Sequence, residues 1–214
     1  MRVLKFGGTS VGSAENIRKV AAIIADYKNR NIAFTTVCSA MRGVTNDLIA
    51  ISGMACDHDD QYKEALKLLE ERHFETATEL TSPKNQSTVF TELKLRFNEL
   101  EDLLHGIFLL KERSLRTIDL VLSFGERLSN FLIAAHLKEI GIDAIFVDTR
   151  KLIVTNNDFG NAKVDYTQSF QNIKAHINDE KSLSICTGFI GSTAKGETTT
   201  LGRGGSDYTA SLLG

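Results

Sequence analysis

The six residues Lys5-Phe6-Gly7-Gly8-Thr9-Ser10 follow directly after the short apolar run Val3-Leu4. The two adjacent glycines lack the Cβ atoms that would hold a bulky anion away from the backbone. Glycine also reaches positive φ values, which turn successive N–H groups inward. A lysine at the end of a strand and two hydroxyls after the glycines add further donors. This segment predicts a binding site for an anion, and a phosphate is the anion that it favours.

A helix is expected directly after this turn. Ser13 is a good N-cap, and Glu15 suits the positive end of the helix dipole. Strand, glycine turn and helix N-terminus therefore follow in the order that a phosphate site uses. The alternative is that Gly7-Gly8 makes only a tight turn. The flanking lysine and hydroxyls weaken that alternative but do not remove it.

Composition excludes several classes of partner. The chain has 214 residues, of which 42% are hydrophobic and 24% charged, as in an ordinary globular protein with a real core. Its net charge is -2, and no basic stretch is interleaved with aromatic residues, so neither nucleic acid nor an anionic membrane is expected as a partner. No apolar run approaches the roughly 20 residues that span a bilayer. A cytoplasmic protein is expected.

Cysteine and histidine residues give no sign of a metal or disulfide site. The three cysteines, Cys38, Cys56 and Cys186, are odd in number and lack C-x-x-C spacing. Cys38 and Cys186 lie in apolar, strand-like runs, so buried thiols are expected there. The five histidines are scattered along the chain, and we assign them no chemistry.

The apolar pattern alternates between periods of two and 3.6, which is typical of an α/β protein. Strands are expected over residues 2–6, 32–37, 143–147, 183–190 and 197–201. The apolar run 118–122 is followed by Ser123-Phe124-Gly125-Glu126, which we interpret as a loop that leads into a helix. The polar stretch 156–168 is expected to be a loop, with a helix over 170–178.

Residues 58–112 have a different character. Pro83 separates two long helical patterns, and the second carries an apolar stripe at helical spacing that is expected to be core. We therefore expect a helical insertion at about 58–112.

A second glycine cluster, Gly202-Arg203-Gly204-Gly205-Ser206-Asp207, also follows a strand and opens a helix, which Ser206 or Asp207 could cap. The sequence contains no G-x-x-x-x-G-K-[ST], no G-x-G-x-x-G and no set of protein-kinase loops. It has instead separate glycine loops with one lysine, one arginine and a few carboxylates at the ends of strands. In an open α/β sheet, ligands collect at that edge.

Five ordered segments together resemble aspartate kinase, of the amino acid kinase superfamily. They are Lys5-Phe6-Gly7-Gly8-Thr9-Ser10, Ser39-Ala40-Met41, Ser123-Phe124-Gly125-Glu126, Thr187-Gly188-Phe189-Ile190-Gly191 and Leu201-Gly202-Arg203-Gly204-Gly205-Ser206-Asp207-Tyr208. The resemblance covers residues 1–214. The opening residues and Leu104-His105-Gly106-Ile107 are most similar to the form that is fused to a homoserine dehydrogenase.

The resemblance implies a fold and a domain organisation. The fold would be α/β, with an open, mostly parallel sheet sandwiched by helices as in carbamate kinase, truncated and carrying the helical insertion. Residues 1–214 would form the N-terminal part that binds aspartate and the phosphoryl group. The rest of the nucleotide site and the ACT regulatory domains would lie outside this chain, so little kinase activity is expected from it alone. NADP would be a cofactor only if a dehydrogenase follows.

The resemblance also implies the reaction. The γ-phosphoryl group of ATP would pass to the β-carboxylate of L-aspartate and give 4-phospho-L-aspartate, the first step towards lysine, threonine, methionine and isoleucine. The attacking carboxylate is already an anion at neutral pH, so positioning and charge neutralisation do the catalysis. Mg²⁺ would arrive with ATP and take no ligand directly from the protein. Aspartate and ATP are the expected partners, together with further copies of the chain in a homo-oligomer.

For the phosphoryl group, the resemblance makes Lys5 and Asp207 the catalytic residues. Lys5 would neutralise the charge on the transferring group, and Asp207 would organise Lys5 or the magnesium phosphate nearby. Backbone and hydroxyl groups would wrap the phosphates, and these belong to Gly7, Gly8, Thr9, Ser10, Gly204 and Gly205. Capping of the last helix is the structural alternative for Asp207.

For the amino acid, the resemblance implies that Glu126 meets the α-ammonium and that Arg203 grips a carboxylate with its planar fork. Ser39, Thr45 and Ser206 would add further donors. Glu126 could instead be a first-turn helix residue, and Arg203 a solvated loop residue. Two other functions stay open at this point. One is a related kinase that acts on a different carboxylate, such as acetylglutamate, and the other is a non-catalytic amino-acid-binding module.

Overall fold

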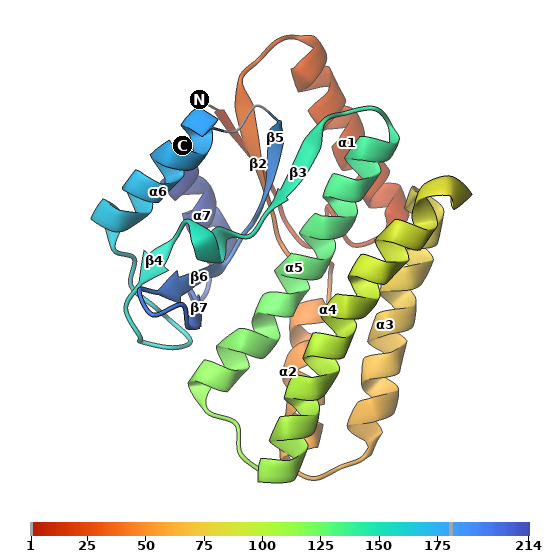
Figure 1. Cartoon of the computed structure of the whole chain (residues 1–214), viewed down its shortest axis with the longest axis vertical. Helices are drawn as coiled ribbons and strands as arrows, with labels where there is room; N and C mark the ends of the chain where they lie inside the picture. Colours follow the sequence, from red (N-terminus) through yellow and green to blue (C-terminus); the bar gives the residue numbers. More distant parts are fainter. Residues whose placement is uncertain (1, 180–181) are drawn as a thin grey trace.

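A four-stranded parallel sheet lies at the centre of the computed structural model, which describes residues 2–179 and 182–214 (Figure 1). Its order is β1-β2-β5-β3, formed by Arg2–Phe6, Phe34–Cys38, Leu183–Thr187 and Ala144–Val147. Successive side chains alternate between its two faces. Cys38 and Ile185 pack into one core, whereas Val37 and Cys186 pack into the other. Both faces are therefore apolar, as a buried parallel sheet requires.

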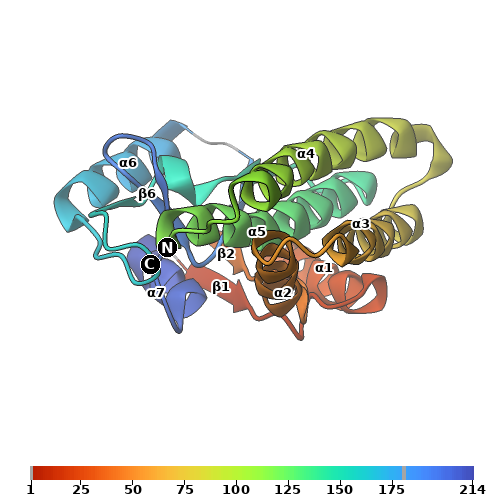
Figure 2. The ribbon, with the colours of Figure 1, turned by 90° about the horizontal axis from the view of Figure 1, so that it is seen from below.

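Helices cover both faces of this sheet (Figure 2). One face packs against α1 (Ala14–Asn29) and α5 (Leu115–Glu139), and the other against α6 (Tyr166–Asp179) and α7 (Gly205–Leu213). Ser13 caps α1 as expected, because its Oγ accepts a hydrogen bond from the backbone N–H of Asn16. The expectation of an open, mostly parallel sheet between helices is confirmed.

A smaller sheet extends the fold beyond the carboxyl ends of the central strands. It contains β4 (Val154–Thr155), β6 (Ile190–Thr193) and β7 (Thr198–Thr200), with β4 parallel to β6 and β6 antiparallel to β7. A single 3-10 turn, η1 (Thr149–Lys151), leads into it.

The single strand expected over 183–190 is wrong, because the chain turns within it. Strand β5 ends at Thr187, and β6 of the smaller sheet begins at Ile190. Between them, Phe189 has a φ of 69°. The pattern of apolar residues does not reveal such a turn, since the chain is buried on both sides of it.

Helices α2 (Val44–Cys56), α3 (Gln61–Leu80) and α4 (Pro83–Leu110) pack with the first half of α5 into a bundle, the helical module, seen at the lower right of Figure 1. Pro83 stands at the start of α4, so the expected separation of two helices is confirmed. The apolar stripe of α4 is core, with Leu93, Leu100 and Leu104 fully buried. In the described residues, no helix is long and apolar enough to cross a membrane.

The interpretation of residues 118–126 as an apolar run and a loop is wrong. Helix α5 runs without a break from Leu115 to Glu139, so Glu126 lies in mid-helix and not in a first turn. Gly125 suggested a loop, but it serves a close contact. A Cβ at that position would lie 2.9 Å from the Cβ of Ala40. The glycine therefore lets the helix press against the loop that follows β2.

The cysteines are free thiols, as expected, and Cys38 and Cys186 are buried. Burial raises the pKa of the Cys186 thiol to about 12, and it also raises that of Cys38. Both thiols are therefore protonated at neutral pH, and they act as small apolar groups in the core.

Candidate active site

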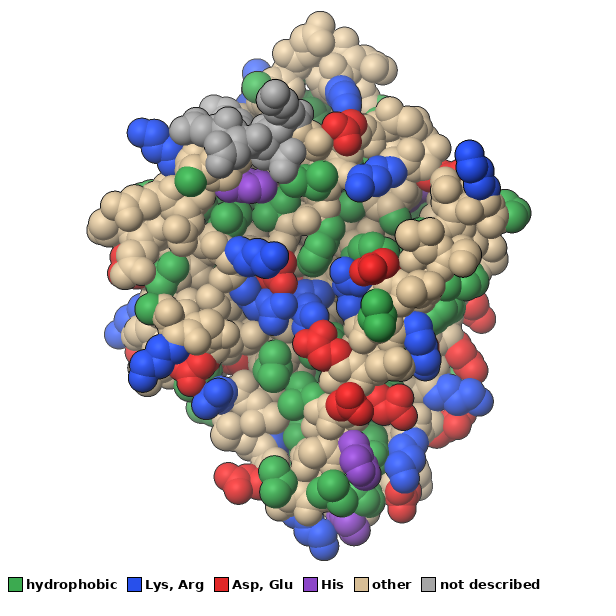
Figure 3. Space-filling model, viewed as in Figure 1, with side chains coloured by type: hydrophobic (Ala, Val, Ile, Leu, Met, Phe, Trp, Pro, Cys, Tyr) green, Lys and Arg blue, Asp and Glu red, His purple; other side chains and the backbone are tan. Residues whose placement is uncertain are grey.

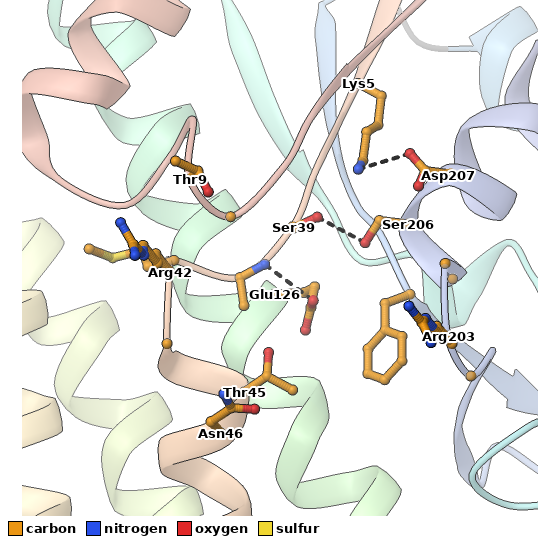
Figure 4. A pocket seen from close by; sticks show the side chains of 18 residues that line it. Lys5, Thr9, Ser39, Arg42, Thr45, Asn46, Glu126, Arg203, Ser206 and Asp207 are labelled. Carbon is orange, nitrogen blue, oxygen red and sulfur yellow. Dashed lines mark hydrogen bonds and ion pairs between the residues drawn. The ribbon is translucent and has the colours of Figure 1, made fainter.

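A pocket of about 480 Å³ opens at the carboxyl edge of the central sheet (Figure 4). Three segments far apart in sequence form most of its wall: the turn after β1, the loop after β2 and the turn between β7 and α7. Its lining residues are Lys5, Gly8, Thr9, Ser39, Ala40, Met41, Arg42, Gly43, Thr45, Asn46, Glu126, Phe189, Gly202, Arg203, Gly204, Gly205, Ser206 and Asp207.

Lys5 and Asp207 form an ion pair inside this pocket. The Nζ of Lys5, on β1, lies 2.8 Å from Oδ1 of Asp207, in the first turn of α7. The side chain of Lys5 is 28% exposed and that of Asp207 is 73% exposed, so both can still reach a ligand. The two glycine-rich turns of the sequence therefore converge on one site.

A second link joins the same segments. The hydroxyl of Ser39 donates a hydrogen bond to the Oγ of Ser206, at 3.0 Å. Gly188 makes this contact possible, because a Cβ there would lie 2.5 Å from Ser206 Oγ. Helix α7 begins at Gly205, and its N-cap residue is Gly204, which has a φ of 77° and makes no side-chain capping bond. The expectation that Ser206 or Asp207 caps this helix is wrong, which leaves both side chains facing the pocket.

Glu126 brings a buried carboxyl group to the centre of the site. Its Oε1 accepts a hydrogen bond from the backbone N–H of Ala40 at 3.2 Å, while no partner of Oε2 is found among the described residues. The residue is only 3% exposed, and burial raises its pKa to about 8. At neutral pH the carboxyl is therefore mostly protonated, and its second oxygen is available to a cationic or hydrogen-bonding ligand.

Two further residues of α5 hold the end of β2 in place. The hydroxyl of Ser129 donates to the carbonyl of Ser39 at 2.7 Å, and the Nδ2 of Asn130 donates to the carbonyl of Cys38 at 2.9 Å. Both side chains are fully buried. Our sequence analysis missed them, although polar residues on the apolar face of a helix are a signal that some buried group needs a partner.

Asp119, near the start of α5, binds the chain just before the turn that carries Arg203. Its Oδ2 accepts from the backbone N–H groups of Gly160 and Thr200, and its Oδ1 accepts from the Thr200 hydroxyl. Burial nevertheless raises the pKa of Asp119 above its ordinary value. This residue was also missed, because its partners lie about 40 and 80 positions away.

Two arginines in the pocket lack partners. Basic and acidic side chains are interspersed on the face shown in Figure 3. Exposed ion pairs, such as that of Lys63 with Asp60, occur at several places in the chain. By contrast, the side chains of Arg203 and Arg42 make no ion pair or hydrogen bond within residues 2–179 and 182–214. Arg203 was expected in the site, whereas Arg42 was missed, as were Asn46 and Phe189.

Of the expected phosphate-binding residues in the first turn, Gly8 and Thr9 line the pocket, whereas Gly7 and Ser10 lie outside its lining. The backbone N–H of Ser10 donates to the carbonyl of Gly7 at 2.9 Å and closes the turn, so this donor is not free for a ligand. Gly8 comes close to the neighbouring loop, since a Cβ there would lie 2.9 Å from the carbonyl oxygen of Ala40. Thr45, Gly204 and Gly205 also line the pocket, as expected.

The fold and this site together define an α/β protein with a pocket at the carboxyl edge of a parallel sheet, lined by Lys5, Arg42 and Arg203 among other polar residues. The chain belongs to the amino acid kinase family, whose model matches residues 1–214. It is 37% identical over 221 residues to Aspartokinase 1, chloroplastic, of Arabidopsis thaliana, a match that covers 99% of this chain and 37% of the relative. The bifunctional aspartokinase/homoserine dehydrogenase 1 of that plant is 32% identical, over 99% of this chain and 23% of its own length.

Among solved structures, E. coli aspartokinase III in complex with aspartate and ADP superposes with a TM-score of 0.89 at 32% identity. The match covers all of this chain and 46% of the other. The expected amino acid kinase fold and the resemblance to aspartate kinase are thereby confirmed. The chain spans less than half the length of each of these relatives.

Proposed function

We propose that this chain carries the aspartate- and phosphoryl-binding groups of an aspartate kinase, which transfers the γ-phosphoryl group of ATP to the β-carboxylate of L-aspartate. The observation that carries the proposal is the Lys5–Asp207 pair at 2.8 Å, in a pocket that also holds Glu126 and Arg203. An amino acid with a second carboxylate needs an acceptor for its ammonium and donors for two carboxylates. These four side chains supply that combination next to a phosphate site.

On the phosphoryl side, Lys5 offsets the negative charge of the group in transfer, and Asp207 keeps the ammonium of Lys5 pointed at it. Backbone N–H groups of Gly8, Thr9 and Gly204 surround the phosphates, and Gly205 lines the same pocket although its own N–H donates to the carbonyl of Gly202 at 3.0 Å. A carboxylate oxygen of aspartate attacks the γ-phosphorus while the bond to the bridging oxygen breaks and ADP departs. No proton has to be removed from the nucleophile, so the site needs no general base.

Magnesium fits this site as a companion of the nucleotide. Within the described residues, no three His, Cys, Asp or Glu side chains lie together as a metal site. Asp207, largely exposed, is the lining carboxylate that would face a magnesium nucleotide. Bound there, the ion supplies additional neutralisation of phosphate charge.

On the amino-acid side, Glu126 receives the α-ammonium on its unpartnered Oε2, and the planar guanidinium of Arg203 grips a carboxylate with two parallel hydrogen bonds. Ser39, Thr45 and Ser206 supply hydroxyl groups around the reacting carboxylate. Support also comes from the E. coli relative, which was solved with aspartate and ADP. We further propose that the protein works as a homo-oligomer in the cytoplasm.

A substrate panel tests this function. The intact protein is incubated with ATP, Mg²⁺ and either L-aspartate, N-acetyl-L-glutamate or L-asparagine, with hydroxylamine present to trap an acyl phosphate as its hydroxamate. We expect ADP and hydroxamate to form with aspartate alone. Hydroxamate with acetylglutamate and none with aspartate would contradict the proposal. Calorimetric titration of aspartate, with and without Mg-ATP, separates a kinase from a module that only binds the amino acid.

A further inference from the structure

The two loops on the β1 and β2 side of the pocket come from neighbouring strands and lie against each other. One follows β1 (residues 7–13) and the other follows β2 (residues 39–43). Glycines allow this close approach, since a Cβ on Gly12 would lie 3.1 Å from the Cβ of Arg42. At these glycines no side chain stands between the two loops. The hydrogen bonds that join the loops therefore help to set their relative position.

Arg72 supplies those bonds from outside the pocket. It stands on α3, in the helical module, and its Nη2 donates to the carbonyl of Gly12 at 3.2 Å and to the carbonyl of Arg42 at 2.9 Å. Its Nη1 lies 3.9 Å from Oδ2 of Asp47, in the first turn of α2. One guanidinium thus contacts both loops and the helix that the second loop opens.

This clamp is the main hydrogen-bonded link between the two loops. In the part of the chain that the structure describes, the strand pairing of β1 with β2 ends at Phe6 and Cys38, followed by one bond from the N–H of Ser39 to the carbonyl of Phe6. Beyond that point, the contacts of Arg72 are the hydrogen bonds that join loop 7–13 to loop 39–43. A lysine has only one nitrogen, so it could not contact the two carbonyls and Asp47 through separate nitrogens, as Nη2 and Nη1 of Arg72 do.

We propose that Arg72 is a positioning residue for the pocket. By fixing the two backbone carbonyls, it sets the spacing between Gly8 and Thr9 on one loop and Arg42 on the other, with Thr45 in the helix that follows. The helical module is then part of the catalytic machinery and not only a packing element. The kinetic consequence of this proposal rests on the proposed kinase function, whereas its structural consequence does not.

Kinetics of the intact protein provide the first test. Arg72→Ala should lower kcat/KM for ATP by roughly 10- to 100-fold, because small misplacements of contact groups carry costs of that order. Methylguanidine added to Arg72→Ala should restore part of the lost kcat/KM. The kcat/KM of Arg72→Lys should lie between those of the wild type and Arg72→Ala. Arg18→Ala is the matched control. Arg18 also ties a helix to a backbone carbonyl, that of Glu79 at 2.6 Å, but that carbonyl belongs to neither of the two loops.

Hydrogen exchange provides a second test that needs no activity. In Arg72→Ala, amide exchange should accelerate at residues 8–13 and 40–44 while the central sheet keeps its wild-type rates; in Arg18→Ala, exchange in both loops should stay unchanged. Unaltered loop exchange in Arg72→Ala and Arg72→Lys would overturn the proposal, as would a kcat/KM equal to that of Arg18→Ala. If the wild type fails to phosphorylate aspartate, the proposed function falls, and the exchange rates alone decide the role of Arg72.

Discussion

The Nζ of Lys5 lies 2.8 Å from Oδ1 of Asp207, which joins the first strand of the chain to its last described helix. Both side chains retain contact with solvent, so the pair adds little to the free energy of unfolding. Its position in the pocket indicates a functional role instead.

Lys5→Ala should therefore lower kcat by about 10²- to 10³-fold, the usual cost of losing one charge-stabilising donor. The free energy of unfolding should change by less than about 1 kcal/mol. Steady-state kinetics and urea denaturation measure the two quantities. The control is Lys19→Ala, which removes the exposed pair of Lys19 with Glu15 (2.6 Å) outside the pocket and should leave kcat unchanged. Equal kcat losses in both variants would rule out a catalytic role for Lys5.

Aspartate binding should depend on pH through Glu126. Because burial raises the pKa of this carboxyl to about 8, it must lose a proton before it can pair with the ammonium of the ligand. Affinity should rise roughly tenfold per pH unit up to about pH 8 and then level off. Calorimetry at pH 7 in two buffers of different ionisation enthalpy should detect proton release on binding. The same affinity at pH 6 and pH 8.5 would exclude this coupling.

Glu126→Gln should remove both this pH dependence and most of the affinity for aspartate.

Glu126→Gln should also change how the stability of the folded protein depends on pH. The ordinary pKa of the unfolded carboxyl is near 4.5, so the folded state holds an extra proton between that value and about 8, and wild-type stability falls with rising pH across this window. The glutamine variant should therefore gain in melting temperature relative to wild type from pH 5 to pH 9. A constant difference would contradict the raised pKa.

Arg203→Lys should raise the KM for aspartate far more than the KM for ATP, because the lysine keeps the charge but loses the fork that matches a carboxylate. The side chain of Arg203 makes no hydrogen bond or ion pair with the described residues that the substitution would remove. Initial rates with each substrate varied in turn measure the two constants. Equal changes in both would place Arg203 elsewhere than at the amino acid.

Gly125→Ala should destabilise the protein, although alanine is the better helix former. The added Cβ would meet Ala40 at 2.9 Å and push α5 away from the loop after β2. Gly106→Ala in α4 is the control, since nothing lies within 4 Å of its added Cβ, and it should gain up to about 1 kcal/mol. Chemical denaturation of both variants compares them. A gain in stability for Gly125→Ala would contradict the close contact.

The sequence predicted those parts of the fold and site that depend on local patterns. Alternating apolar residues identified the strands of the central sheet, and the two glycine clusters with their lysine and aspartate identified the pocket. Ser13 as an N-cap also follows from its neighbours alone. These features are readable because the residues that determine them are adjacent in the chain.

Features that depend on distant contacts were missed or misread. Gly125 suggested a loop, because sequence does not show that Ala40 lies against it. The break between Thr187 and Ile190 was hidden by burial on both sides. Arg72 looks like an ordinary surface arginine, since the carbonyls that it binds lie 60 and 30 positions away. Such residues acquire their roles only when the fold is assembled.

Glu126 sits in the middle of a continuous 25-residue helix, whereas Arg203 sits on a turn between glycines with positive φ. The two ends of a bound amino acid would thus contact two different kinds of element, a long helix at Glu126 and a short turn at Arg203. A larger ligand cannot gain room by bending the helix locally, because the whole rod is anchored in two separate cores. The turn around Arg203 is the short element of the two, so a change in its length is the more direct way to fit the pocket to a ligand of another size.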